Sequence, residues 1–222
     1  MSRKIWLLAG VAAALGLFGI QGAAAQAAEF HCSFAPCRIT AKADGTGTTA
    51  HHVITILGKN TKGSAVSLTI TCEKMTGEGE AATTTTSEIV IHPEYANCNI
   101  GGVPATPSTI GCFYGLGASG SFKVICEPGA EITFNAKGCI FGIVGQVMNG
   151  VIPYTNILSE GKAAETTAAI KAKSVSGMTY SKNCDEVFGI DISSTNTWIY
   201  ETGNVILTGE STKGVMGNFT WG

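Results

Sequence analysis

Basic residues are scarce in this chain, and those present do not gather into a patch. Its 222 residues include 14 lysines and arginines against 16 aspartates and glutamates. Arg3 and Lys4 lie together near the start. Most other basic residues are scattered singly, as Lys42, Lys123 and Lys137 are. A surface that binds nucleic acid needs clustered basic side chains to neutralise phosphates. We therefore expect no nucleic-acid partner.

Long apolar runs are also missing, apart from one near the start, Ile5–Ile20. Two basic residues precede this run, and the small-x-small sequences Ala23–Ala25 and Ala25–Ala27 follow it. This order of features is that of a signal peptide, and either sequence suits cleavage. A membrane anchor is the alternative, but the 16 residues of the run are fewer than the roughly 20 of a spanning helix. We expect residues 1–27 to be removed and the product to be secreted, with no membrane attachment.

A sustained helical period is missing as well, whereas short alternating runs recur between glycine, proline, asparagine and aspartate. Val66–Cys72 is the cleanest example, because apolar and polar residues alternate along its length. About twelve such runs, spaced by roughly 8 to 15 residues, are typical of an all-β protein. We predict a disulfide-stabilised antiparallel β-sandwich over residues 28–222. If it consists of two packed β subunits, the boundary is expected near residues 116–120.

Three hairpins are expected from turn residues between these runs. An Asp-Gly pair joins the runs 37–43 and 52–57, and a polar Gly-Lys-Asn segment joins the second of these to 66–72. A Glu-Pro-Gly-Ala segment joins 121–126 to 131–134, between two similar boxes of sequence Gly-Cys-apolar-aromatic-Gly. The boxes therefore bracket a predicted central hairpin.

Four further segments have simple expectations. The Gly-Glu repeat at 76–80 is expected to be a polar turn, and residues 101–108, with two prolines, an irregular connection. The apolar run 140–148 suits a strand or a short buried helix, and Gly142 and Gly145 favour the strand. The Ala- and Thr-rich segment 162–173 suits a short helix or a strand, and its β-branched residues favour the strand.

Eight cysteines lie after the expected leader, and an even number in an exported chain predicts four disulfides. They are Cys32, Cys37, Cys72, Cys98, Cys112, Cys126, Cys139 and Cys184. About a hundred connectivities are open to eight cysteines. Proximity along the chain favours the pairs Cys32–Cys37, Cys98–Cys112 and Cys126–Cys139, which leaves Cys72–Cys184.

Metal binding is the alternative role for some of these cysteines. His31, Cys32 and Cys37 are close in sequence, and His51 and His52 follow. Zinc sites favour paired C-x2-C spacings and reduced thiolates, and neither is expected in an exported chain. We expect no metal and no other cofactor.

Several of these features occur together in a family of proteins. They are Phe30-x-Cys32, Pro36-Cys37-x-Ile39-Thr40, Tyr95-x-x-Cys98, the Gly-Cys-x-aromatic box, and Cys139 seven residues before Gln146. In these features the chain resembles an uncharacterised family of secreted, cysteine-paired, strand-rich proteins of high-GC soil bacteria. The resemblance covers most of the mature chain. It implies an extracellular β fold and transfers no catalytic residue.

The sequence contains no convincing catalytic motif. Gly115–Gly120 reads G-x-G-x-x-G, but a strand is expected after it in place of the helix that a dinucleotide site needs. A glycine turn is the favoured interpretation. No serine lies in a G-x-S-x-G elbow, and His31, His51, His52 and His92 occur in no recognisable catalytic context.

Two acidic pairs are candidates for glycosidase carboxylates, which face each other across a cleft. They are Glu78 with Glu80, and Asp185 with Glu186. Because both pairs occupy turn-like sequences, solvated surface charge is the favoured interpretation of each.

Trp198 and Tyr200 are the remaining candidates for a site. Residues two apart on one strand share a face, so the two rings form either a stacking platform for a ligand or, more often, part of a core. We predict a non-enzymatic structural or binding protein of the bacterial surface or extracellular space, with an unknown extracellular partner such as a polysaccharide. A carbohydrate-binding or adhesive module is the alternative and predicts an exposed aromatic row. A secreted hydrolase is less favoured and predicts polar side chains converging in a deep cleft.

Overall fold

The computed structural model describes residues 27–43, 52–60, 62–174, 177–180, 184–191 and 197–222. The expected leader, except for Ala27, lies outside this part of the chain. Strands dominate what is described, which confirms the all-β prediction. The strands are β1 (Phe30–Cys32), β2 (Cys37–Ala43), β3 (His52–Asn60), β4 (Ala65–Ala81), β5 (Thr85–Thr86), β6 (Glu88–Ile100), β7 (Val103–Ser108), β8 (Cys112–Gly117), β9 (Phe122–Cys126), β10 (Ile132–Ala136), β11 (Cys139–Ile143), β12 (Gln146–Gly150), β13 (Tyr154–Ile157), β14 (Glu165–Ser174), β15 (Met178–Tyr180), β16 (Ile190–Asp191), β17 (Thr197–Glu210), β18 (Met216–Gly217) and β19 (Phe219–Trp221). The helix α1 (Cys184–Phe188) has five residues.

Eight of the strands close into an antiparallel barrel. Their order is β2, β4, β6, β8, β9, β12, β14 and β17, and β17 pairs with β2 to complete the ring. The structure is thus a closed barrel with additional strands, and not clearly the sandwich that the alternation predicted. Alternation requires one buried and one solvated face, and a barrel wall meets that requirement as well as a sandwich does.

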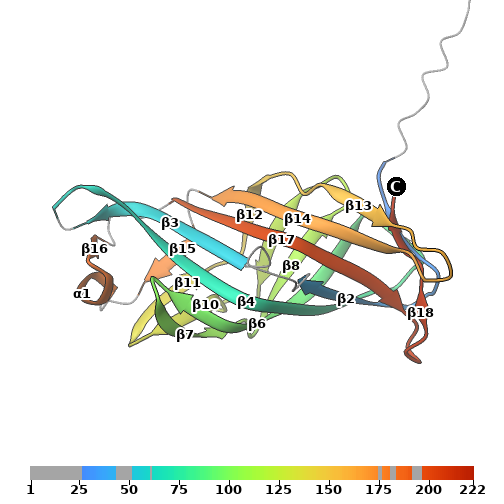
Figure 1. Cartoon of the computed structure of the whole chain (residues 1–222), viewed down its shortest axis with the longest axis horizontal. Helices are drawn as coiled ribbons and strands as arrows, with labels where there is room; N and C mark the ends of the chain where they lie inside the picture. Colours follow the sequence, from blue (N-terminus) through green and yellow to red (C-terminus); the bar gives the residue numbers. More distant parts are fainter. Residues whose placement is uncertain (1–26, 44–51, 61, 175–176, 181–183, 192–196) are drawn as a thin grey trace, which may run out of the picture.

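Three long strands, β4, β6 and β17, extend beyond the barrel (Figure 1), where β3 pairs with β4 and β17, and β7 pairs with β6. β2 lies between β17 and β4 within the barrel, and β3 takes the same place further along the two strands. The first expected hairpin is therefore wrong, because β2 and β3 follow one another along β4 and β17. The Asp-Gly pair lies outside the described residues. The second hairpin, β3 with β4, is confirmed.

The central hairpin is also wrong, because β9 pairs with β8 and β12, whereas β10 pairs with β7 and β11. Each Gly-Cys box instead begins a strand of a separate hairpin, at Cys112 in β8 and at Cys139 in β11. Lys137 and Gly138, between β10 and β11, both have positive φ, of 50° and 84°. Two consecutive positive φ values match the twist of a tight hairpin. Because only one of the two positions holds a glycine, the sequence signal of this turn is weak.

Residues 76–80 lie within β4 and do not form a turn. An added Cβ at Gly79 would overlap the carbonyl oxygen of Val90, and one at Gly77 would overlap the Ile91 side chain. These glycines therefore allow β4 and β6 to approach closely. Two other expectations are corrected: residues 103–108 form β7, and the run 140–148 is divided between β11 and β12. The strand preference for 162–173 is confirmed by β14.

All eight cysteines are paired, as expected, and Cys32–Cys37 is the expected pair. The other three expected pairs are wrong. The bridges are Cys72–Cys98, Cys112–Cys126 and Cys139–Cys184. Two of them join residues directly opposite in paired strands, β4 with β6 and β8 with β9. In these two bridges, the pairing of the strands decides which cysteines meet.

A three-stranded sheet of β19, β1 and β5 packs against the barrel through aromatic side chains. The buried ring of Phe30 lies 5.1 Å from that of Tyr154 in β13 and 5.7 Å from that of Phe219 in β19, between centroids. The Nε1 of Trp221 donates to the carbonyl of Ala118 at 2.7 Å. Within the described residues, no helix has the length and apolarity needed to cross a membrane.

Candidate functional site

Trp198 and Tyr200, the predicted aromatic candidates, belong to the core. Each side chain is 1% exposed. Neither ring therefore offers a face to a ligand, and the core interpretation of this pair holds. The Tyr200 hydroxyl is hydrogen-bonded to Nδ1 of His52 at 2.8 Å and to the Tyr95 hydroxyl at 3.0 Å. The Tyr95 hydroxyl is also bonded to that of Tyr114.

The other predicted candidates are separated in the structure. Gly117 and Gly120 form the turn between β8 and β9, as the glycine-turn interpretation expected, and the strand β9 follows. His31 is exposed in β1, His52 is buried in β3, and His51 lies outside the described residues. Cys32 and Cys37 are held in a disulfide. Among the described residues, no three His, Cys, Asp or Glu side chains are grouped to hold a metal ion.

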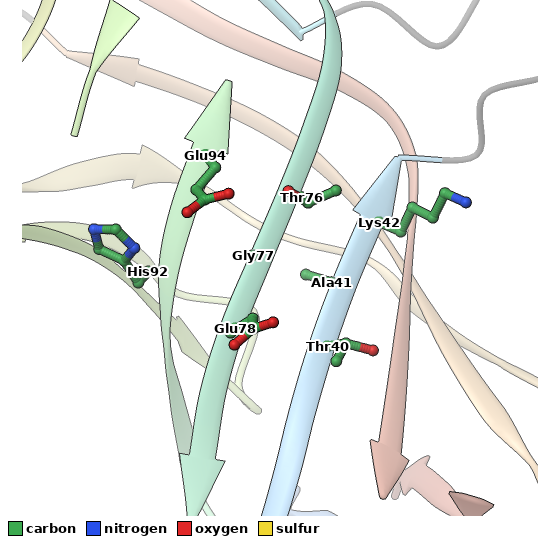
Figure 2. Close-up of a pocket in the computed structure, with 8 residues that line it drawn as sticks. All are labelled: Thr40, Ala41, Lys42, Thr76, Gly77, Glu78, His92 and Glu94. Carbon is green, nitrogen blue, oxygen red and sulfur yellow. The ribbon is translucent and has the colours of Figure 1, made fainter. Parts of the chain in front are cut away.

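One member of the acidic pairs, Glu78, lies in a polar hollow on the outer wall of the barrel. The hollow has a volume of about 350 Å³ and crosses β2, β4 and β6 (Figure 2). Strand register arranges six of its side chains in two rows across these strands. The rows are Thr40, Glu78 and His92, and Lys42, Thr76 and Glu94.

These rows follow from alternation in paired strands. Side chains at i and i+2 share a face, and directly opposite residues have Cβ atoms about 4.5 to 5.5 Å apart. The intervening residues Ala41, Gly77 and Pro93 are opposite one another and buried. Because the chain is paired on both sides along β4, the hollow has a rigid floor. Neither Glu80 nor Glu186 lines it.

A second hollow of about 350 Å³ adjoins the first on the other side of β6. His92 and Glu94 line both hollows. Ser108 and Thr109 add polar groups to the second hollow, and Ile110, whose side chain is 81% exposed, lies at its edge. We call the two hollows together the β6 groove.

The two carboxylates of the β6 groove differ, because among the described residues Glu78 forms an ion pair and Glu94 does not. Glu78 accepts a hydrogen bond from Nη2 of Arg38 at 2.7 Å, and this bond raises the pKa of Arg38. Glu94 forms no ion pair with any residue in the described part of the chain. In Figure 2 the Lys42 side chain extends away from the acidic residues. The groove therefore presents an uncompensated carboxylate beside an imidazole and hydroxyl groups.

An apolar ring lies close to the polar rows. The Phe113 ring in β8 is edge-on to that of His92, with centroids 5.6 Å apart. Such a border of polar and apolar side chains is common in sites for small polar ligands. Sequence reasoning overlooked Glu94, His92 and Thr76 as a group. The alternation of β4 and β6 could have placed them on one face, but only the register shows that they meet.

Comparisons with known proteins do not assign the chain to a family: no protein-family model, no curated protein and no solved structure matches it. The resemblance to secreted, cysteine-paired, strand-rich bacterial proteins therefore stays a prediction.

Proposed function

We propose that the protein is a non-enzymatic extracellular binding protein and that the β6 groove is its binding site. The observation that carries this proposal is the placement of His92 and Glu94 between two adjoining hollows, with further polar side chains in register beside them. Rigid strands are suited to hold a binding site in a fixed geometry.

An extracellular location is supported by the four disulfides, which persist mainly in oxidising compartments. The Cys72–Cys98 bridge joins β4 to β6, and the Cys112–Cys126 bridge joins β8 to β9. A protein that keeps its binding face in shape outside the cell gains from such cross-links.

Binding is favoured over hydrolysis by how the carboxylates are placed. Glu78 and Glu94 project from the same face of one sheet, as diagonal neighbours on β4 and β6. Glycosidase carboxylates face each other from opposite sides of the bond that they cleave.

A screen of the refolded mature chain against immobilised polysaccharides, peptides and surface proteins tests the proposal. We expect at least one polymer to bind, and we expect Glu94→Gln to weaken that binding by about tenfold or more. Glu160→Gln is the matched control, because it removes the same charge from an exposed loop away from the groove. Retained binding in Glu94→Gln, or no bound polymer of any class, would contradict the proposal. Release of cleaved products would contradict its non-enzymatic part.

A further inference from the structure

We infer that the β6 groove takes a non-anionic glycan chain, laid across strands β2, β4 and β6. This inference rests on the proposed function and names the chemical class of the ligand. Four features of the groove support it: the direction in which it runs, its hydrogen-bonding groups, its charge and its extent.

The direction of the groove favours recognition by side chains over strand addition. The lining residues come in turn from β2, β4, β6 and the segment 107–110, so the groove crosses the strands. A peptide that binds by extending a sheet lies along a free edge. In the first hollow β4 is paired with β2 and β6, which leaves no free edge there. A ligand that fills this hollow must therefore be recognised by side chains.

The side chains offer what a sugar hydroxyl requires. Glu94 accepts hydrogen bonds, while the hydroxyls of Thr76 and Ser108 and the imidazole of His92 can accept or donate them. A sugar hydroxyl is both a donor and an acceptor, so it can satisfy each of these groups. The apolar face of a sugar ring also needs an apolar contact. Ile110, which is exposed and lines the second hollow, provides such a contact, and the Phe113 ring lies edge-on to that of His92.

The charge of the groove selects against anionic polymers. Glu78 is compensated by Arg38, but Glu94 is not compensated by any described residue. An anionic glycan would bring its own charge to this carboxylate, and like charges brought together in a binding site oppose association. Neutral and amino-bearing glycans share the hydroxyl chemistry without this repulsion.

The extent of the groove indicates more than one sugar unit. Each hollow is about 350 Å³, near the lower end of the range for small-ligand sites. His92 and Glu94 separate the two hollows and contact both. A chain that fills both hollows would reach Ile110 as well as Thr76. Affinity should therefore rise from a monosaccharide to a short oligosaccharide.

Titration calorimetry with defined oligosaccharides tests this inference on the refolded mature chain. The probes are neutral glucan and xylan oligomers, amino-bearing chitosan oligomers, and acidic oligogalacturonates. We expect binding of neutral or amino-bearing oligomers and at least tenfold weaker binding of the acidic ones. Added salt should weaken the binding of chitosan oligomers and leave that of neutral oligomers almost unchanged. This difference in salt dependence distinguishes a neutral glycan ligand from an amino-bearing one.

Variants separate failure of this inference from failure of the proposed function. Glu94→Gln should weaken glycan binding about tenfold. Glu94→Lys should improve the binding of acidic oligomers relative to that of neutral and amino-bearing ones. Ile110→Ser should weaken the binding of oligomers more than that of monosaccharides. Glu160→Gln and Glu160→Lys should have no effect, and thermal melts establish that each variant is folded. Binding of only peptides or acidic polymers, weakened by Glu94→Gln, would overturn the glycan inference and leave the proposed function in place. Absence of any binding that depends on Glu94 would overturn both.

Discussion

The hydroxyl of Tyr200 lies 3.0 Å from that of Tyr95, although 105 positions separate the two residues in the chain. Tyr95 is in β6 and Tyr200 in β17, which are not neighbours in the barrel. His52 and Tyr114 extend the contact into a buried polar network. Buried hydroxyls are stable only when bonded, so the network constrains the spacing of the strands that carry it.

Replacing Tyr200 by phenylalanine is expected to destabilise the fold. The change removes one bond from Tyr95 and one from Nδ1 of His52. Leaving a buried polar group without its hydrogen bond costs about 1 to 3 kcal/mol, so we expect the free energy of unfolding to fall by about 2 kcal/mol. Urea unfolding measures it. Tyr154→Phe, which loses a single bond to the Gly117 carbonyl, should cost less, and equal losses would contradict the role of the network.

Alkaline pH is expected to unfold the protein, because its buried tyrosines ionise at their ordinary pKa only in the unfolded chain. Burial raises the pKa of Tyr95 and Tyr200 well above the ordinary value, and it raises the pKa of Tyr114 to about 12. A raised pKa means that the folded state retains protons that the unfolded state loses, so stability is intact below about pH 10 and falls above it. Tyrosinate absorbance should rise together with loss of structure. Ionisation of most tyrosines near pH 10 in a folded protein would contradict the burial.

The disulfides that close the longest and the shortest loops should differ in how much they stabilise the fold. Cys139–Cys184 spans 45 positions and Cys32–Cys37 spans five. In the chain-entropy model these loops correspond to about 4 and about 2 kcal/mol. Removing each bridge by paired Cys→Ser changes, followed by urea unfolding, measures the two. Peptide mapping should recover Cys139 linked to Cys184, and thiol titration of the unreduced denatured chain should detect no thiol; a Cys126–Cys139 peptide would contradict the pairing.

Alanine at Gly79 is expected to be worse than alanine at Gly77. The added methyl group at Gly79 would overlap the backbone oxygen of Val90, whereas at Gly77 it would overlap the Ile91 side chain, which can turn aside. Overpacking typically costs about 1 to 3 kcal/mol, and we expect the Gly79 variant at the upper end. Thermal melting of both variants compares them. The opposite order would show that β4 and β6 approach differently.

Much of the fold could be predicted from local patterns, and most of its pairings could not. Alternation identified Val66–Cys72 as strand and favoured strand at 162–173, because a pleated, half-buried segment has a local signature. The partners of β2 and β9 depend on strands distant in the chain, and no local signal specifies them. The glycines at 77 and 79 are required by a neighbouring strand, so in isolation they resemble turn residues.

The candidate site was hidden for the same reason. Glu94 and Thr76 are ordinary alternating residues until β4 and β6 are aligned in register. Trp198 and Tyr200 were conspicuous in the sequence because aromatic residues are few, but pairing on both sides of β17 places both in the core. Sequence reasoning therefore identified the large side chains, whereas the surface arrangement of small and charged ones required the structure.

The most direct test of the account is a nuclear magnetic resonance titration of the labelled mature chain with neutral and chitosan oligosaccharides. The account predicts that backbone amide shifts change for His92, Glu94 and residues 40–42, 76–78 and 108–110, which line the β6 groove. The same titration of Glu94→Gln should produce smaller changes at equal ligand concentration. No shift changes, or changes clustered on another face of the barrel, would contradict the assignment of the groove as the binding site.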